Sequence, residues 1–433
     1  MSRSVEASPS RAAAAGPVPS APAGTGRLIG VDAARGLALI GMLAVHLLPA
    51  VDREGSGPSL QWTLFAGTAS ALFALLAGLG LALSSGGRTP HRGRELTADR
   101  VGLVVRALIV TAVGLLVNEV MPTPAPAFGI LVYYGAFFLL AVPLLHLRRR
   151  TLAACAAAAA LLGPVLLHVL DPVLPRPQTP NPTLGSVLAD PGASLAQVLL
   201  TGTYPAVPYL TYLCAGLLIG RLDLHDVAVR VRLVAIGGGT AAGAWLLYRQ
   251  LVLRGGGYDQ LMQHTPWLSE AQIDEIIVWG PSPDLPTSTW WWLLTPGPHS
   301  TTPVSLLLDL GVAMAALGAL LLIARPRSVW TTLGAMGAST LTLYAGHLLA
   351  LATMVHVDHR VLWFAVHVLA AAVLAVLWRA AFGRGPLEKL VGSAARRARR
   401  LVPPGPRTPA GPRGPRATGT SPGPSHAGNV RGG

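Results

Sequence analysis

Long apolar stretches dominate this 433-residue chain, and each is about as long as a helix must be to cross a bilayer. Backbone polar groups inside a bilayer are satisfied only in helices or in closed barrels. Barrel strands alternate apolar and polar residues, whereas these stretches are continuous and rich in Leu and Ala. The sequence therefore predicts an all-α, polytopic integral membrane helix bundle. We expect about ten spans, at 30–50, 60–84, 101–121, 128–147, 151–170, 204–220, 232–253, 303–324, 329–354 and 361–381.

Charged residues are few and unevenly placed. Only 12% of the residues are charged, against roughly a quarter in soluble domains. The net charge of +14 raises the alternative of a nucleic-acid partner. Every second loop is basic, however. This pattern favours the positive-inside rule, by which cytoplasmic loops carry an excess of Lys and Arg, as the explanation of the net charge. We therefore expect both termini in the cytoplasm and no nucleic-acid partner. The basic loops carry Arg88, Arg92, Arg94 and Arg100; Arg148, Arg149 and Arg150; Arg221, Arg230 and Arg232; and Arg325 and Arg327.

The two ends of the chain differ in composition from the middle. Residues 1–27 are mostly Ala, Pro, Ser and Gly, without the apolar region of a signal peptide, and they predict a disordered cytoplasmic arm. Residues 28–392 form the membrane domain. Residues 393–433 are rich in Arg, Pro and Gly and predict a disordered basic tail that can lie on anionic lipid. We expect a multi-pass protein of the cell (plasma) membrane with lipid partners, and a homo-oligomer is compatible with these features.

Two of the loops expected outside the cytoplasm are long, at 171–203 and 254–302. The first is rich in Pro and contains a candidate re-entrant or interfacial piece at 194–202. The second contains a candidate helix at 269–279, which Ser269 can cap, followed by Trp290-Trp291-Trp292. For this Trp cluster we favour anchoring at the headgroup level over stacking on a sugar.

The first span carries three ionisable side chains, Asp32, Arg35 and His46. Such groups are costly inside a membrane and are functional candidates by default. A helix turns about 100° per residue, so Asp32 and Arg35 share a face one turn apart. His46 lies within about 20° of the same face, about 16 Å further along the axis. The alternatives are a structural ion pair near the helix start and a histidine that only touches the interface.

Other polar residues in the spans are weaker candidates. Asp309 needs a partner, and a buried structural pair explains it as well as a function does. Cys155 and Cys214 lack metal-ligand spacing and are typical of small buried hydrophobes, so we expect no metal. We expect structural roles for the histidines near span ends or on apolar faces, which are His146, His168, His356, His359 and His367.

The first span also resembles a known group of enzymes. The segment 31–38, Val-Asp-Ala-Ala-Arg-Gly-Leu-Ala, with Met42 and His46 after it, is similar to the opening span of transmembrane acyltransferases. These include the heparan-α-glucosaminide N-acetyltransferase catalytic family and the YeiB-like bacterial membrane proteins. The spacing of Arg35 and His46 also resembles the signature of the acyltransferase-3 family. The resemblance covers roughly residues 28–392, with further motifs at 72–80, 114–116, 130–135, 204–205, 216–221, 341–344 and 384–388.

Two positions depart from the YeiB-like pattern. Where that branch often has a His after the Gly-Leu pair of the third span, this chain has Val117-Asn118. Gly129 stands where an Asp commonly precedes the Ile-Leu pair of the fourth span. These changes leave His46 in place and bear on the acceptor side of the site, and so on the identity of the substrate.

The resemblance implies transfer of an acyl group, acetyl first of all, from acyl-CoA to a sugar, a lipid-linked glycan or a small acceptor outside the cytoplasm. Acyl-CoA is made in the cytoplasm, on the side where we expect Arg35. His46 is the implied catalytic residue, either as general base or as carrier of the acyl group. The implied donor-binding residues are Asp32, Arg35, Arg100, Arg106 and Arg221, of which Arg100 and Arg221 taken alone are better explained by the positive-inside rule. The implied acceptor-side residues are Asn118, Glu119, Tyr344 and His347.

Two non-enzymatic hypotheses stay open beside this one. A secondary transporter or flippase also has buried charges and long outer loops, but the sequence shows no inverted repeat and no pair of broken helices at matching positions. A membrane scaffold would use mainly the basic tail. Of the three hypotheses we favour the acyltransferase.

Overall fold

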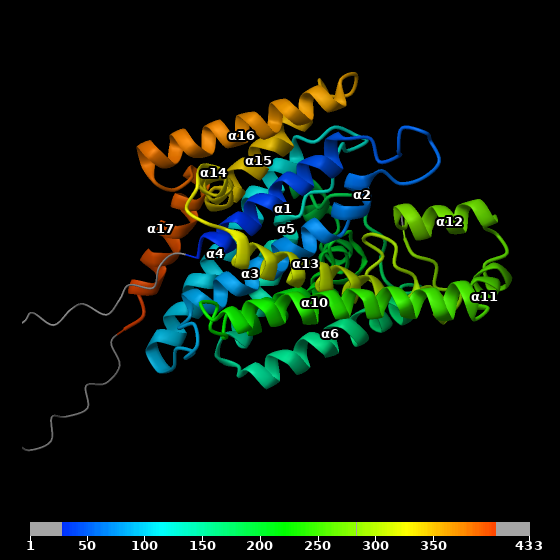
Figure 1. Cartoon of the computed structure of the whole chain (residues 1–433), viewed down its shortest axis with the longest axis horizontal. Coiled ribbons are helices and arrows are strands. Elements are labelled where there is room, and N and C mark those ends of the chain that lie inside the picture. The colour runs from blue at the N-terminus through cyan, green and yellow to red at the C-terminus, as the bar shows by residue number, and fades with distance from the viewer. Residues whose placement is uncertain (1–27, 283, 404–433) are drawn as a thin grey trace, which may run out of the picture.

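The structure is a computed structural model that describes residues 28–282 and 284–403, and every regular element in this part of the chain is a helix (Figure 1). The expected all-α architecture is confirmed. In chain order the helices are α1 (Ile29–Leu47), α2 (Leu60–Phe65), α3 (Thr68–Ser84), α4 (Gly93–Glu119), α5 (Leu131–Ala141), η1 (Val142–His146), α6 (Arg149–Leu170), α7 (Leu184–Ala189), α8 (Pro191–Ala196), η2 (Gln197–Thr201), α9 (Ala206–Ile219), α10 (Val227–Tyr248), η3 (Arg249–Arg254), α11 (Gly257–His264), α12 (Glu270–Trp279), η4 (Trp290–Leu294), α13 (Pro303–Ile323), α14 (Ser328–Ala338), α15 (Thr340–Leu351), α16 (Arg360–Phe382) and α17 (Pro386–Arg400).

Seven helices of the described chain are long and apolar enough to cross a membrane, and three shorter apolar helices accompany them. The long ones are Ile29–Leu47, Leu60–Ser84, Gly93–Glu119, Arg149–Leu170, Val227–Arg254, Pro303–Ile323 and Arg360–Phe382, and the short ones are Leu131–His146, Ala206–Ile219 and Thr340–Leu351. Each of them overlaps one of the expected spans. The protein is therefore a polytopic helical membrane protein, while the number of crossings and the position of both termini in the cytoplasm stay predictions.

Helix α1 occupies the centre of the bundle and packs against α3, α13 and α14. It begins at the end of the bundle where α17 lies, and α11 and α12 project from the opposite end (Figure 1). Close approach of α14 to α1 depends on Gly337, where a Cβ would overlap the backbone of Asp32. Helix α16, by contrast, is mostly exposed along its length, as expected for a helix that faces lipid.

Two of the expected spans are broken, which differs from the expectation of continuous helices. The second span turns between α2 and α3 at Gly67, whose φ of +77° belongs to the left-handed region. Thr68 begins α3 and donates a hydrogen bond to Asp309 of α13 at 2.8 Å, so Asp309 has a structural partner. The ninth span is interrupted at Ser339, between α14 and α15. An apolar pattern does not show such breaks, because neighbouring helices re-satisfy the freed backbone groups.

The segment 254–302, which we expect outside the cytoplasm, folds around a small second core. The candidate helix at 269–279 is confirmed as α12, and Ser269 caps it in a reciprocal pair of hydrogen bonds with Gln272. Trp292 is fully buried and donates to Thr265 at 3.1 Å, so it cannot anchor the protein in lipid headgroups. That part of the interpretation is wrong, because the tryptophan supplies the core of this segment. Trp290 remains exposed.

The C-terminal boundary of the membrane domain also differs from the expectation at 393. Helix α17 runs on to Arg400 and packs along α4. Its buried face carries Val391, Ala395 and Ala398, and Arg399 forms an ion pair with the buried Asp99 of α4 at 2.6 Å. The arginines up to this point therefore belong to an amphipathic helix, with Arg396, Arg397 and Arg400 exposed and Arg399 directed toward α4. The expected disordered arm at 1–27 and the rest of the expected tail at 404–433 lie outside the described residues.

Candidate active site

A cavity of about 620 Å³ lies between α1, α3, α4, α5, α15 and the α16–α17 connection. Its two ends differ in chemistry. One end is lined by Arg35, Arg106 and Arg384, together with the carboxylates of Asp32 and Glu388. The other end is lined mainly by apolar side chains and by the ring of Tyr344, and it reaches Met42 of α1. The cavity therefore has the polarity of a site for a molecule with an anionic head and a long, weakly polar arm.

The predicted pair at the start of α1 is formed. The guanidinium of Arg35 lies 3.4 Å from the carboxylate of Asp32, one helical turn away, and also donates to the carbonyl of Leu76 at 3.5 Å. Both side chains line the cavity. Asp32 is almost completely buried, whereas Arg35 keeps part of its side chain exposed. The pair thus fixes the direction of Arg35 without removing it from the cavity.

The other two cavity arginines come from opposite ends of the sequence. Arg106 of α4 was expected at the donor site, and its guanidinium lies 6.0 Å from the centre of the Phe138 ring. Arg384 was not singled out for this role, although it opens the motif at 384–388. It follows the end of α16, and Glu388 beyond it accepts two hydrogen bonds from Thr342, at 3.1 and 2.6 Å. These bonds hold the start of α17 against α15.

The structure places Arg221 away from the cavity. Its buried guanidinium donates to the carbonyl oxygens of Ala82, Gly87 and Leu145, at 3.2, 2.7 and 2.5 Å. A guanidinium has five donors in a fixed fork, and here they tie the end of α3 and the loop that follows it to η1. We therefore correct the implied role of Arg221 from donor binding to structural support.

Arg100 also stays outside the cavity. It is directed toward His146, with 3.2 Å between its guanidinium and the Nδ1 atom of that residue. Neither residue lines the 620 Å³ cavity. The alternative given by the positive-inside rule fits Arg100 better than donor binding does.

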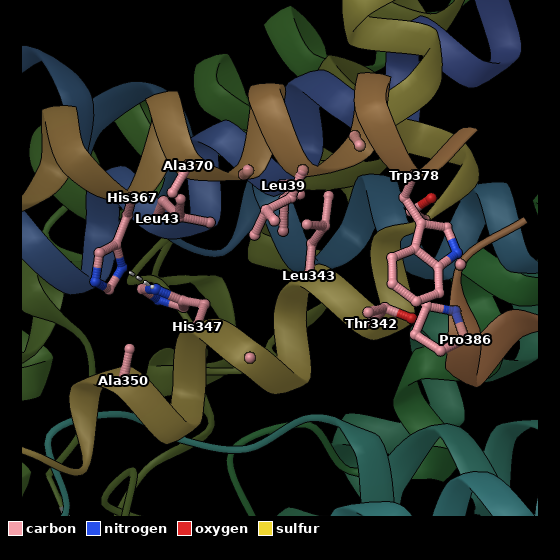
Figure 2. A pocket seen from close by; sticks show the side chains of 16 residues that line it. Leu39, Leu43, Thr342, Leu343, His347, Ala350, His367, Ala370, Trp378 and Pro386 are labelled. Carbon is pink, nitrogen blue, oxygen red and sulfur yellow. Dashed lines mark hydrogen bonds between the residues drawn. The ribbon is translucent and has the colours of Figure 1, made fainter. Parts of the chain in front are cut away.

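His46 lies one helical turn, about 6 Å, beyond Met42 on α1, and so follows directly on the apolar end of the cavity. Its Nδ1 is 3.0 Å from Nε2 of His347, and the two rings stack with their centres 5.3 Å apart. Nδ1 of His347 is in turn 2.7 Å from Nδ1 of His367 (Figure 2). The three imidazoles come from α1, α15 and α16, and together form one hydrogen-bonded chain.

The histidine chain differs from the sequence interpretation in two ways. His347 was expected to line an acceptor pocket, whereas both of its nitrogens are engaged by other histidines. His367 was expected to have only a structural role. His367 meets His347 because α16 packs beside α15. The sequence signal that could have found it is a polar residue within an otherwise apolar span.

Three further residues expected on the acceptor side hold the protein's own loops. Asn118 donates to the carbonyl of Pro182 at 2.8 Å, and Glu119 accepts from the backbone of Leu184 at 3.0 Å. The Tyr344 hydroxyl donates to the carbonyl of Phe128 at 3.3 Å. Of these, only Tyr344 lines the cavity. Asn118 and Glu119 therefore hold the residues on either side of Thr183, the N-terminal cap of α7, and do not face a ligand in the cavity.

His299 stands out among residues that the sequence did not single out. It lies in the connection between η4 and α13 with a φ of 57°, a conformation that costs energy for any residue except glycine. Its Nδ1 is buried and has no partner within the described residues. The ring of Tyr204 meets it edge-on at 5.2 Å. Burial lowers the pKa of His299 to about 4, so the imidazole is neutral at neutral pH.

Comparison with known families identifies the family of the chain. The family model "Heparan-alpha-glucosaminide N-acetyltransferase, catalytic" matches residues 27–248, just over half of the chain. The chain belongs to this family. The matched region contains Asp32, Arg35, His46 and Arg106, and the family makes the protein a membrane enzyme of the acetyltransferase type. No curated protein matches the chain. Within the described residues, no group of three or more His, Cys, Asp or Glu side chains is arranged to hold a metal ion.

Proposed function

We propose that the protein transfers an acetyl group, or a similar small acyl group, from acyl-CoA to an acceptor on the opposite side of the membrane. The observation that carries this proposal is the 620 Å³ cavity, which begins at three guanidinium groups and ends one helical turn from His46. An acceptor with an amino or hydroxyl group on a sugar fits the family, whose name specifies a glucosaminide.

The donor end is defined by Arg35, Arg106 and Arg384. Guanidinium groups bind phosphates through charge-assisted and often bidentate hydrogen bonds, and CoA carries several phosphates. Alternating basic loops predict that this end faces the cytoplasm, where acyl-CoA is available. The pantetheine arm would then follow the apolar part of the cavity, past Met42 and Tyr344, and bring the thioester to His46.

His46 supplies the chemistry through its free ring nitrogen. Because Nδ1 is engaged by His347, Nε2 is the atom available to a substrate. Nε2 takes the proton of the acceptor amine or hydroxyl as that group attacks the thioester carbonyl. A new C–N or C–O bond forms, the C–S bond breaks, and the leaving thiolate receives the proton from the imidazolium. The products are the acylated acceptor and CoA.

The broken spans bear on the transporter hypothesis, because broken helices also mark transporter sites. In this protein the break between α14 and α15 places Gly337, Ala338 and Thr340 in the wall of the cavity. The break between α2 and α3 is tied to Asp309. Both breaks thus have a local structural explanation, and the experiment that tests catalysis also tests transport.

The test measures CoA binding and acetyl-CoA turnover by purified protein in detergent, with glucosamine as a probe for amino-sugar acceptors. Wild type and His46→Ala are compared. We expect both to bind CoA and only the wild type to release CoA from acetyl-CoA. Radiolabelled acetyl that stays on quenched protein would assign His46 the role of acyl carrier instead of base. A folded wild type that neither binds CoA nor consumes acetyl-CoA would overturn the proposal and make transport the leading hypothesis.

A further inference from the structure

We propose that His347 and His367 are positioning residues for His46, and that the three imidazoles act as one hydrogen-bonded chain that sets the tautomer of His46 and shares its charge. This inference rests on the proposed function, because it concerns how His46 is made reactive. Neither positioning residue lies in the region that the family model matches.

The hydrogen bonds in the chain constrain each other. A neutral imidazole has one N–H donor and one acceptor nitrogen. His347 uses Nε2 toward His46 at 3.0 Å and Nδ1 toward His367 at 2.7 Å. It must therefore donate to one neighbour and accept from the other. The direction of one bond fixes the direction of the other, and two arrangements of the whole chain exist.

Only one of these arrangements makes His46 a base. When His46 donates from Nδ1 to His347, and His347 donates from Nδ1 to His367, Nε2 of His46 carries a lone pair. In the reverse arrangement Nε2 of His46 carries the proton and can only donate. The second nitrogen of a functional histidine commonly decides its tautomer through such a bond. His347 therefore selects the reactive form of His46.

The same chain has a place for the proton that His46 receives. When Nε2 of His46 accepts the acceptor's proton, the Nδ1 proton of His46 can pass to Nε2 of His347. The Nδ1 proton of His347 then passes to Nδ1 of His367. His46 and His347 end neutral, and His367 becomes the imidazolium. The reverse shift returns one proton to the departing thiolate, so protons and charge balance over the reaction.

The far end of the chain opens on an apolar groove and not on a polar exit. A groove of about 420 Å³ runs between α1, α15 and α16, and His347 and His367 lie at one end of it (Figure 2). Leu39 and Leu343 line its middle, and Leu43 lies nearer the histidines (Figure 2). Apolar side chains do not hydrogen-bond water, so this surface does not hold water molecules that could carry the proton away. The chain therefore spreads the charge over three rings while the proton stays in the site, which matters most in a low dielectric.

The test uses graded variants of the positioning residues. His347→Leu removes both hydrogen bonds. His347→Gln keeps an acceptor for Nδ1–H of His46 but cannot pass a proton. His367→Phe removes only the terminal acceptor and keeps a ring of similar size. His264→Phe is the control, because His264 is exposed on α11 in the outer segment. Each protein is assayed for CoA affinity, KM for acetyl-CoA, and kcat.

We expect kcat to fall about 10- to 100-fold in His347→Leu, the usual effect of losing such an orienting partner, with CoA affinity unchanged. His347→Gln should recover part of this loss, and His367→Phe should lose less than His347→Leu. A merely structural role predicts parallel losses of CoA affinity and no rescue by Gln. If kcat were unchanged in His347→Leu while His46→Ala is inactive, the inferred role of the histidine chain would be overturned and the proposed function would stand.

A second measurement tests whether His347 sets the tautomer of His46, and it does so even if no turnover is found. Protein labelled with ¹⁵N-histidine reports which ring nitrogens carry protons, and His46→Ala identifies the His46 signals. We expect His46 to be the Nδ1–H tautomer in the wild type, and to change to a mixture of tautomers in His347→Leu. The same His46 signals in wild type and His347→Leu would overturn the inference independently of the enzyme assay.

Discussion

The side-chain oxygen of Asn118 lies over the α-carbon of Gly129, at a position where any Cβ on residue 129 would overlap it. These are the two positions at which the chain departs from the YeiB-like pattern. Asn118 also donates to the carbonyl of Pro182, and the backbone N–H of Gly129 donates to Asn181 at 2.8 Å. The two departures thus form one contact that ties the loop before α5 to the loop before α7.

This contact predicts that Gly129→Ala destabilises the protein. The added methyl group must push Asn118 away from its bond to Pro182, and overpacking of this kind costs about 1–3 kcal/mol. Thermal unfolding in detergent measures the loss. Gly238→Ala in α10 is the matched control, because a Cβ there meets nothing within 4 Å and Ala is favoured over Gly in a helix. Equal melting temperatures for Gly129→Ala and wild type would contradict the contact.

The sequence predicted those features that depend on a single helix. Asp32 and Arg35 pair because they lie one turn apart, and Ser269 caps α12 because capping is local. Features that depend on several helices were not predicted. Arg106 and Arg221 both lie near span ends, and only the packing of α3 against its neighbours makes one a cavity residue and the other a ligand of backbone carbonyls.

The histidine chain shows the same limit. His46 was singled out from its position on α1. Its partner His347 was assigned to the acceptor, and His367 was set aside, because periodicity gives the face of each helix but not which faces meet. The break at Ser339 is a further reason, since it changes the course of the ninth span between α14 and α15. Apolar patterns carry no information on such breaks.

Removing an arginine from the donor end of the cavity should lower the affinity for CoA and change the rate of the chemical step little. Arg35→Ala and Arg384→Ala each remove one guanidinium from the cavity. A hydrogen bond to a charged group contributes about 1.5–3 kcal/mol, so KM for acetyl-CoA and Kd for CoA should rise roughly 10- to 100-fold. The value of kcat at saturation should change much less. Titration with CoA and steady-state kinetics measure both quantities.

Arg100→Ala is the control for this prediction, because Arg100 is directed toward His146 outside the cavity. It removes the same charge from the same expected side of the membrane. If Arg100→Ala weakened CoA binding as much as Arg35→Ala does, the effect would come from the general positive potential. The cavity would then not be the specific donor site.

Substitution of Arg221 should have the opposite effect: the protein should lose stability without a specific loss of CoA affinity. Arg221→Met removes the donors that satisfy the carbonyls of Gly87 and Leu145, while the carbonyl of Ala82 keeps the backbone N–H of Gly87. Each buried carbonyl left without a partner costs about 1–3 kcal/mol. Arg221→Lys should restore little, because an ammonium cannot reproduce the planar fork. Thermal unfolding is the measurement, with Arg88→Ala as control because its ion pair with Asp223 is exposed.

The burial of His299 predicts that stability depends on pH below neutrality. Its folded-state pKa is lowered by burial to about 4, whereas an unfolded histidine titrates near 6.5. Between these values the unfolded chain binds more protons, so the free energy of unfolding falls as the pH falls from about 6.5 to 4. The contribution of this one group is at most about 3 kcal/mol, and it is fully present only above about pH 6.5.

His299→Gln should remove this part of the pH dependence, since an amide does not titrate. Between pH 7.5 and 4.5 the melting temperature of the wild type should therefore fall more steeply than that of the variant, because only the wild type loses stability when the unfolded chain binds a proton at residue 299. His264→Gln serves as the control, because that side chain is exposed and should leave the pH profile unchanged. Parallel profiles for wild type and His299→Gln would show that His299 gains a proton without cost in the folded protein. In that case the imidazole must reach water or an acidic partner, contrary to the buried Nδ1 in this structure.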